Sequence, residues 1–274
     1  MTELSIPTTS ARTIYRPPEL LADHPTHYCP GCGHGIVHRL VAELLGEMGL
    51  AERTIGVASV GCSVFAYDYL AIDFVESPHG RAPAVATGVR RARPEAFVFT
   101  YQGDGDLAAI GTAEIVHAAA RGERISAIFV NNGIYGMTGG QMAPTTLAGQ
   151  KTTSSPLGRD TSVVGFPLPV TEMLSLLPGV QYAARTSVAD PGLIGKSKAA
   201  IRRAFEVQQE GNGFAIVEIL STCPVGWGMT PTAAMDRLAS TVMDAYTTGT
   251  FVDRAKGIAP SLPQPGTKMA TAEA

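Results

Sequence analysis

The chain contains few cysteines, few charged residues and almost no tryptophan. Its 274 residues include four cysteines and one tryptophan, and only 16% of them are Asp, Glu, Lys or Arg. The formal net charge is −3 and Lys and Arg are scattered, which argues against a nucleic-acid-binding groove. Because no apolar run approaches the roughly 18 residues of a membrane span, we also expect no membrane partner.

The two ends of the chain lack the features of a buried segment. Residues 1–20 contain no apolar signal core, so we expect an N-terminal arm on a cytoplasmic protein, in which stable disulfides are rare. Residues 256–274 are rich in proline and small side chains, which predicts a flexible tail. Since neither an internal repeat nor a Gly/Ser linker divides the remainder, residues 21–255 are predicted to form a single domain.

Hydrophobic periodicity predicts helices that alternate with strands. Helical spacing occurs at residues 34–49, 83–92, 106–122 and 192–211, and short apolar runs typical of strands occur at 54–61, 96–102, 125–132, 181–187 and 214–220. This alternation predicts an α/β fold, a mostly parallel sheet with helices on both faces. A long polar segment at 133–161 interrupts the pattern, and loops of that length are usually functional or disordered.

Gly103-Asp104-Gly105 lies where a predicted strand passes into a predicted helix. Ligands bind at this edge of a parallel sheet, two glycines let the backbone approach an anion, and a helix N-terminus offers free N–H groups. An acidic residue in an anion site requires a bridging cation, so Asp104 predicts Mg²⁺ shared with a diphosphate. Asn132 ends the next predicted strand, and its amide oxygen is a second ligand of the kind that Mg²⁺ prefers.

Six short segments occur in an order that identifies a family. They are CPGCGHG (29–35), VGCS (60–63), HGRAPAVATG (79–88), GDGD (103–106), NNGIYGMTGGQ (131–141) and STCP (221–224). With them, residues 15–247 resemble the β subunit of the 2-oxoacid:ferredoxin oxidoreductases, particularly the branched-chain 2-oxoacid and 2-oxoglutarate types. The resemblance implies a thiamine-diphosphate-binding fold that holds thiamine diphosphate, Mg²⁺ and one [4Fe–4S] cluster.

The resemblance also implies which residues bind the cofactor. By family position these are Gly61, Cys62, Ser63, Gly103, Asp104, Gly105, Asp106, Asn132, Ile134, Tyr135, Gly136, Met137 and Thr138. The Mg²⁺ ligands would be Asp104, Asn132 and the backbone carbonyl of Ile134. Met137 stands where pyruvate-type relatives carry asparagine, which implies a different substrate, although simple apolar packing is an alternative role for its side chain.

Two histidines are candidate catalytic residues. His34 follows the CxxCG loop and His79 lies in the segment Ser77–Arg81. A protonated imidazole would favour the carboxylate of the substrate, whereas a purely structural role is the alternative for each. Pyruvate-type relatives carry glutamate at the position of His34, so this residue also implies a different substrate.

All four cysteines match cluster ligands of the family: Cys29, Cys32, Cys62 and Cys223. Cys62 and Cys223 each follow a predicted strand, so both are expected at the same sheet edge as the diphosphate. Spacing alone leaves a Cys₄ zinc site open, although typical zinc sites contain a second close-spaced pair that this chain lacks. Four unrelated buried cysteines are another alternative, but they leave the turn residues around Cys29 and Cys32 unexplained.

Three further residues have open roles. Lys151 and Arg159 lie in the polar segment and could meet a substrate carboxylate, but solvated loop positions are favoured for both. Trp227 follows Cys223 by four positions and either shields the cluster or packs in the core.

The resemblance implies a coenzyme A-acylating enzyme that converts a 2-oxoacid to acyl-CoA and CO₂ and passes electrons to ferredoxin. In the family, an α subunit supplies the glutamate that activates thiamine, and γ and ferredoxin-like subunits can complete the assembly. The apolar content of 45% and the mean hydropathy of +0.12 fit either a large core or a surface that such partners cover. The alternatives are a non-redox thiamine decarboxylase or synthase with structural zinc, and a non-enzymatic binding module, which leaves Asp104 and Asn132 unexplained.

Overall fold

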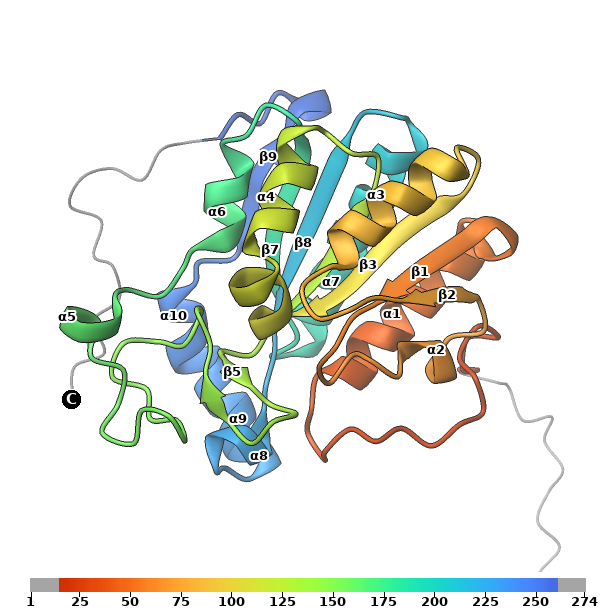
Figure 1. The fold of residues 1–274 in the computed structure, drawn as a ribbon. Coiled ribbons are helices and arrows are strands. Elements are labelled where there is room, and N and C mark those ends of the chain that lie inside the picture. Colours follow the sequence, from red (N-terminus) through yellow and green to blue (C-terminus); the bar gives the residue numbers. More distant parts are fainter. Residues whose placement is uncertain (1–14, 261–274) are drawn as a thin grey trace, which may run out of the picture.

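The computed structural model describes residues 15–260, and at its centre a seven-stranded sheet lies between two layers of helices (Figure 1). The strands, in spatial order, are β2 (Asp73–Glu76), β1 (Thr54–Ala58), β3 (Phe97–Gly103), β4 (Ser126–Asn131), β8 (Phe214–Leu220), β7 (Val180–Ser187) and β9 (Gly249–Asp253). Neighbouring strands are parallel except for β7 and β9, which are antiparallel. The predicted α/β fold with a mostly parallel sheet is therefore confirmed.

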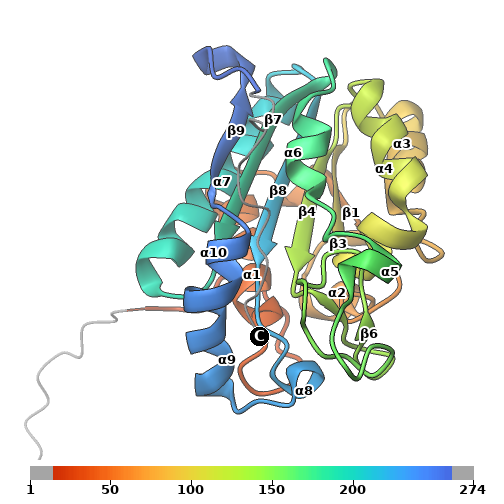
Figure 2. The same ribbon diagram turned by 90° about the vertical axis from the view of Figure 1, so that its left-hand side faces the viewer.

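Different helices cover the two faces of the sheet. One face carries α1 (His34–Glu47) and α7 (Pro191–Gln209), and the other carries α3 (Ala82–Ala92), α4 (Thr112–Ala120) and α6 (Val170–Ser175), as Figure 2 shows from the side. Along β3, Phe97 and Phe99 enter the core beneath α1 and α7, whereas Val98 enters the opposite core. This division follows from the strand geometry, because successive side chains point to opposite faces.

Local sequence explains where the two long helices begin and end. Asp190 caps α7, since its Oδ1 accepts a hydrogen bond of 2.9 Å from the N–H of Leu193. Pro191 occupies the first turn, where its missing N–H leaves no helical hydrogen bond unmade. At the end of α1, Gly49 adopts a φ of +62°, as expected of the predicted C-cap glycine.

Several elements differ from the prediction. The strand predicted at 54–61 ends at Ala58, and the helix predicted at 106–122 is divided into a π-helical turn, η2 (Gly105–Ile110), and α4. Neither β2 nor β9 was predicted, and they form the two edges of the sheet. These edge strands are short and partly exposed, so they lack the continuous apolar run that marks a strand buried on both faces.

The remaining elements are short. They are η1 (Ala51–Arg53), α2 (Ala66–Tyr69), the hairpin β5 (Ile134–Tyr135) and β6 (Gln141–Met142), α5 (Thr161–Val164), α8 (Pro224–Trp227), α9 (Pro231–Arg237), η3 (Leu238–Val242), α10 (Met243–Ala245) and η4 (Arg254–Lys256). In Figure 1, β5, α8 and α9 gather at the lower end of the molecule, beyond the carboxyl end of β8. This is the edge where the sequence predicts the cofactor.

The structure covers parts of both predicted terminal segments. Residues 15–20 of the predicted arm are described and residues 1–14 lie outside the described range. In the predicted tail, Ile258 pairs with Asp253 through two backbone hydrogen bonds of 3.0 and 3.1 Å, so its first residues are part of the fold. Residues 261–274 lie outside the described range. None of the helices within residues 15–260 is both long enough and apolar enough to cross a bilayer.

Candidate functional site

A pocket lies at the carboxyl edge of β1, β3 and β4, where the chain leaves each strand. It is lined by His34, Val60, Gly61, Cys62, Ser63, His79, Gly103, Asp104, Gly105, Asp106, Asn132, Ile134, Tyr135, Gly136, Met137 and Thr138. This set contains every residue that the sequence predicts to bind the thiamine cofactor or to act in catalysis, and it adds Val60. The convergence has a simple cause, because the carboxyl ends of parallel strands share one edge of the sheet.

Asp104 lies directly after β3 and is 2% exposed. Its Oδ1 accepts a hydrogen bond of 2.7 Å from the N–H of Gly105, and its Oδ2 accepts hydrogen bonds from the N–H of Ile134 at 3.2 Å and from Oγ1 of Thr145 at 2.9 Å. Burial raises the pKa of Asp104 to about 6, although these hydrogen bonds act to lower it. A cation beside the carboxylate would offset this cost of burial, so the residues present fit a Mg²⁺ ion.

Asn132 faces the same place from the end of β4. Its Oδ1 accepts a hydrogen bond of 3.2 Å from the N–H of Ile134, the same N–H that contacts Asp104. The preceding residue points elsewhere, because Nδ2 of Asn131 donates a hydrogen bond of 2.7 Å to Glu218 in β8. Two hard side-chain oxygens thus converge on one backbone group, and Mg²⁺ binding by Asp104, Asn132 and the Ile134 carbonyl stays a prediction.

Ser63 supports a polar ligand in the same pocket. Its side chain is 1% exposed, and its Oγ has no hydrogen-bond partner within residues 15–260. Buried hydroxyls are normally hydrogen-bonded, so an orphaned one on the pocket wall fits a site whose ligand supplies the partner.

The four cysteines lie in one region beside this pocket. Sγ of Cys62 and Sγ of Cys223 each lie 3.3 Å from the point that a Cβ on Gly136 would occupy. Burial raises the pKa of Cys62 to about 12, and the thiols of Cys223, Cys32 and Cys29 add to this increase. Burial likewise raises the pKa of Cys32 to about 11. The thiols of Cys62 and Cys32 are therefore protonated at neutral pH in the absence of a metal centre, and binding one would release their protons.

The four thiols are candidate ligands of either a cluster or a single zinc ion. Within the described residues, no three His, Cys, Asp or Glu side chains are already arranged around one metal position. Zinc would take up to four sulfur ligands at about 2.3 Å from one centre, whereas in a [4Fe–4S] cluster each cysteine binds a different iron. The predicted cluster stays a prediction.

His34 is buried at the start of α1. It is the first residue of this helix, its Nδ1 lies 3.0 Å from Oη of Tyr101, and its ring stacks on Tyr28 at a centroid distance of 4.9 Å. Burial lowers the pKa of His34 to about 4, which disfavours the protonated imidazole. The attraction of a substrate carboxylate by a protonated His34 stays a prediction.

Asp106 is engaged with the protein. Its two carboxylate oxygens contact donors on Ser59, His79, Gly80 and Gln102. Asp106 lines the pocket as predicted, its carboxylate already contacts these four groups, and its contact with a cofactor stays a prediction. Asp106 contacts His79 from the π-helical turn η2, and the hydrophobic pattern did not predict this turn.

Two of the residues with open roles are assigned by their contacts. Arg159 is 6% exposed and donates to the carbonyls of Ala143, Pro144, Thr146, Gly165 and Phe166. The favoured solvated position is therefore wrong for Arg159, which instead holds the polar segment together, whereas Lys151 is exposed as expected. Trp227 donates a hydrogen bond of 3.0 Å from Nε1 to the carbonyl of Asn132, so it supports the predicted metal ligand.

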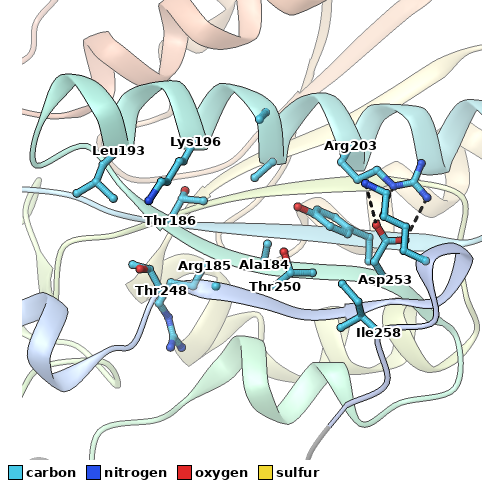
Figure 3. Close-up of a pocket in the computed structure, with 15 residues that line it drawn as sticks. Ala184, Arg185, Thr186, Leu193, Lys196, Arg203, Thr248, Thr250, Asp253 and Ile258 are labelled. Atoms are coloured by element: carbon cyan, nitrogen blue, oxygen red, sulfur yellow. Dashed lines mark hydrogen bonds and ion pairs between the residues drawn. The ribbon is translucent and has the colours of Figure 1, made fainter.

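Another pocket, of about 400 Å³, lies between α7 and β9 (Figure 3). Lys196, Arg203 and Asp253 are among its lining residues. Nε and Nη2 of Arg203 bind Asp253 at 3.0 and 3.1 Å, so these two charges offset each other. None of the predicted site residues lines this pocket, and it is not the candidate active site.

Comparison with known proteins first defines the class. The family model described as "Thiamine pyrophosphate enzyme, C-terminal TPP binding domain" matches residues 59–219. This range begins at the end of β1 and includes Asp104, Asn132 and the polar segment. The chain thus carries a thiamine pyrophosphate-binding domain.

Relatives define the family more narrowly. Ketoisovalerate oxidoreductase subunit VorA of Methanothermobacter thermautotrophicus is 53% identical over 199 residues, which are 73% of this chain and 42% of that protein. The 2-oxoglutarate synthase subunit KorB of Archaeoglobus fulgidus is 37% identical over 214 residues, 78% of this chain and 76% of that protein. The chain therefore belongs to the β subunits of the 2-oxoacid:ferredoxin oxidoreductase family, and it spans less than half the length of the ketoisovalerate relative.

A solved structure agrees with this assignment. The 2-oxoglutarate:ferredoxin oxidoreductase from Magnetococcus marinus, with 2-oxoglutarate, coenzyme A and succinyl-CoA bound, matches with a TM-score of 0.71 and 25% identity. The match covers 94% of this chain and 90% of that one. The two chains share their fold over almost their full lengths.

Proposed function

We propose that this chain is the thiamine diphosphate- and iron–sulfur-binding subunit of a coenzyme A-acylating 2-oxoacid:ferredoxin oxidoreductase. The enzyme converts a 2-oxoacid and coenzyme A to acyl-CoA and CO₂ and passes two electrons to ferredoxin. The observation that carries the proposal is the meeting of Asp104, Asn132 and Cys62 in one pocket. A hard-oxygen site for a metal diphosphate then lies next to a thiol site for an electron acceptor.

The protein positions the reacting groups. Bound thiamine diphosphate would supply the electron sink for decarboxylation, and a cluster beside it would supply the electron acceptor. Gly103 and Gly105 would allow the backbone to approach the diphosphate, and Asp104 and Asn132 would hold Mg²⁺ with the carbonyl of Ile134. The grouping of these residues in one pocket supports binding of the diphosphate end of the cofactor there.

The cluster site consists of Cys29, Cys32, Cys62 and Cys223. Cys62 lines the thiamine pocket and its thiol is near that of Cys223, so electrons need to travel only a short distance. A Cys₄ zinc site with non-redox thiamine chemistry is the second candidate, and the lack of a second close-spaced pair of cysteines counts against it.

The pocket that this chain forms alone is smaller than a complete ligand-binding site. It encloses about 110 Å³, less than the roughly 300–1,000 Å³ of sites that enclose a drug-sized ligand. Val60 and Met137 on its wall are 37% and 44% exposed. An α subunit closes the pocket and brings the activating glutamate, and γ and ferredoxin-like subunits complete the complex.

A branched-chain 2-oxoacid such as ketoisovalerate is the favoured substrate. The chain is 53% identical to the ketoisovalerate relative and 37% identical to the 2-oxoglutarate synthase relative. Val60, Ile134 and Met137 give the pocket an apolar wall, and no Lys or Arg is among the described residues that line it. An apolar wall favours a branched tail, whereas the second carboxylate of 2-oxoglutarate needs a charged partner when buried.

The test is anaerobic purification of this chain co-expressed with its partner subunits. A brown complex with a broad band near ~400 nm that bleaches on reduction is expected, with coenzyme A-dependent reduction of a viologen dye that is faster with ketoisovalerate than with 2-oxoglutarate. The Cys223→Ser variant should lose about four irons per copy of this chain. Stoichiometric zinc in the wild type, with thiamine-dependent decarboxylation but no dye reduction, would support the second candidate.

A further inference from the structure

Asp106 and His79 form a pair at the pocket to which the proposed function gives no role. Nδ1 of His79 lies 2.6 Å from Oδ1 of Asp106. The Asp106 side chain is 2% exposed, whereas the His79 side chain is 32% exposed and lines the pocket that contains Asp104 and Asn132. The second ring nitrogen, Nε2, makes no hydrogen bond within residues 15–260, so it is left to the pocket.

The surroundings of Asp106 decide which nitrogen of His79 carries the proton. Oδ1 also accepts hydrogen bonds from Oγ of Ser59 at 2.8 Å and from the N–H of Gly80 at 2.6 Å, and Oδ2 accepts one of 2.5 Å from Nε2 of Gln102. A carboxylate offers about four acceptor sites and no donor. Because Asp106 acts as the acceptor on both oxygens, the proton in the shared contact belongs to Nδ1, and in the neutral imidazole the lone pair then lies on Nε2.

The backbone around the pair is tightly held. Gly80 adopts a φ of +79°, and a Cβ at this position would lie 2.7 Å from the nitrogen of Gly111, just after η2. The N–H of Ser77 donates a hydrogen bond of 2.8 Å to the carbonyl of Ala58 at the end of β1. The loop that carries His79 is thus clamped between β1 and the π-helical turn that carries Asp106, and single π-helical turns occur frequently at functional sites.

We infer that Asp106 is a positioning residue that fixes the tautomer and ring plane of His79, so that Nε2 accepts a hydrogen bond from a proton-bearing group of the bound reactants. The inference deepens the proposed function and rests on it for the identity of those reactants. The hydrogen-bond donor to Nε2 is one of two groups. It is either the thiol of coenzyme A, or a proton-bearing group of the other reactants that is already present when the 2-oxoacid loses CO₂. The experiment distinguishes these sources.

The first measurement is the tautomer itself. The complex is assembled with only this chain ¹⁵N-labelled at histidine, and solid-state ¹⁵N NMR separates protonated from unprotonated ring nitrogens. We expect one histidine protonated at Nδ1 and bare at Nε2, assigned by its disappearance in His79→Asn. A wild-type His79 that carries its proton on Nε2 overturns the inference, whether or not the complex is active.

Variants of the carboxylate test whether Asp106 sets this tautomer. Asp106→Asn keeps an oxygen that can accept from Nδ1, so the wild-type pattern should persist, whereas Asp106→Leu should lose it. Ser59→Ala removes another hydrogen bond to Asp106 and leaves the contact with His79, so it should behave as the wild type. If Ser59→Ala and Asp106→Leu lose the Nδ1-protonated signal of His79 to the same extent, the cause is a general loosening of the loop, and the positioning role of Asp106 is overturned. If the Asp106→Leu complex fails to assemble, loss of that signal in Asp106→Asn overturns the positioning role instead.

The second measurement tests the role of Nε2. In His79→Asn the new amide can still donate to Asp106, but nothing replaces Nε2. We expect kcat to fall by about 10²-fold, with KM for the 2-oxoacid unchanged within about threefold and the unfolding temperature of the complex unchanged. Wild-type kcat in His79→Asn overturns the role of Nε2.

Comparing two reactions then identifies the donor. If the thiol is the donor, His79→Asn slows the coenzyme A-dependent reaction but not decarboxylation without coenzyme A, and if the other group is the donor, both reactions slow alike. A wild-type complex that turns over no 2-oxoacid, yet shows the expected tautomer, would overturn the proposed function while upholding the positioning of His79.

Discussion

Oγ1 of Thr145 donates a hydrogen bond of 2.9 Å to Oδ2 of Asp104, across 41 positions of the chain. Thr145 is completely buried, and its carbonyl accepts a hydrogen bond of 2.8 Å from Oη of Tyr246. The polar segment at 133–161 is therefore a wall of the predicted metal site, and the buried guanidinium of Arg159 binds its carbonyls. The segment is ordered and contacts Asp104, which supports the functional role, one of the two that its length and polarity predict.

Thr145→Val should weaken Mg²⁺-dependent binding of thiamine diphosphate. The substitution keeps the side-chain shape but removes the hydroxyl that orients Asp104, and a hydrogen bond to a charged group contributes about 1.5–3 kcal/mol. We expect affinity for the cofactor to fall about tenfold, measured by calorimetry on the cofactor-free complex. Thr153→Val, an exposed position in the same segment, is the control and should bind like the wild type. Equal affinities for all three proteins would exclude this role of Thr145.

Trp227→Phe separates a role at the metal site from a role at the cluster. The variant keeps an aromatic ring but removes the N–H that binds the carbonyl of Asn132 at 3.0 Å. We expect several-fold weaker binding of thiamine diphosphate with unchanged iron content. Loss of iron at unchanged cofactor affinity would assign Trp227 to shielding the cluster instead.

Gly136→Ala should disturb the cluster. The added Cβ would lie 3.3 Å from Sγ of Cys62 and from Sγ of Cys223, a spacing at which neighbouring atoms must move apart. We expect lower iron and sulfide content in the anaerobically purified complex, or a shifted reduction potential. Gly46→Ala in α1 meets no atom within 4 Å and serves as the control. Iron content and potential identical to the wild type would show that the two cysteines do not ligate the cluster in this arrangement.

Arg185→Met should destabilise the fold. The Arg185 side chain is fully buried, its Nε binds Glu218 at 2.8 Å and its Nη1 binds Glu172 at 2.7 Å. Removing the cation leaves a buried carboxylate unpaired, which costs about 3–5 kcal/mol. We expect a clear fall in the unfolding temperature of the complex, partly restored by the double substitution with Glu218→Gln.

The matched control for that variant is Arg93→Met. Arg93 pairs with Glu95 on the surface, where the two side chains are 67% and 65% exposed. Exposed ion pairs contribute little to stability, so no measurable change is expected. Equal effects at both positions would show that burial does not set the strength of the Arg185 pair.

The sequence was sufficient to predict that Asp104 and Asn132 lie together, because this follows from the order of strands and helices along the chain. Asp104 and Asn132 each end a long apolar run, and parallel strands with long apolar runs are central and adjacent. The carboxyl ends of these strands must then lie at one edge of the sheet. Asp104 and Asn132 are therefore neighbours in space although they are 28 positions apart in sequence. The same reasoning placed Cys62 and Cys223 at that edge. The edge strands β2 and β9 escaped prediction because they are short and partly exposed, so no hydrophobic period marks them.

The amino-acid sequence by itself determined the fold class, the family and the residues that line the candidate pocket, because the alternation of helices and strands and the spacing of the motifs can be read along the chain. Only the tertiary structure decided the order of the strands and how individual polar groups are used. A hydrophobic pattern records whether a position is buried, but it does not record which donor meets which acceptor. For that reason the contact between His34 and Tyr101, the buried Arg159 and the contact between Asp106 and His79 emerged only when segments distant in sequence were packed together.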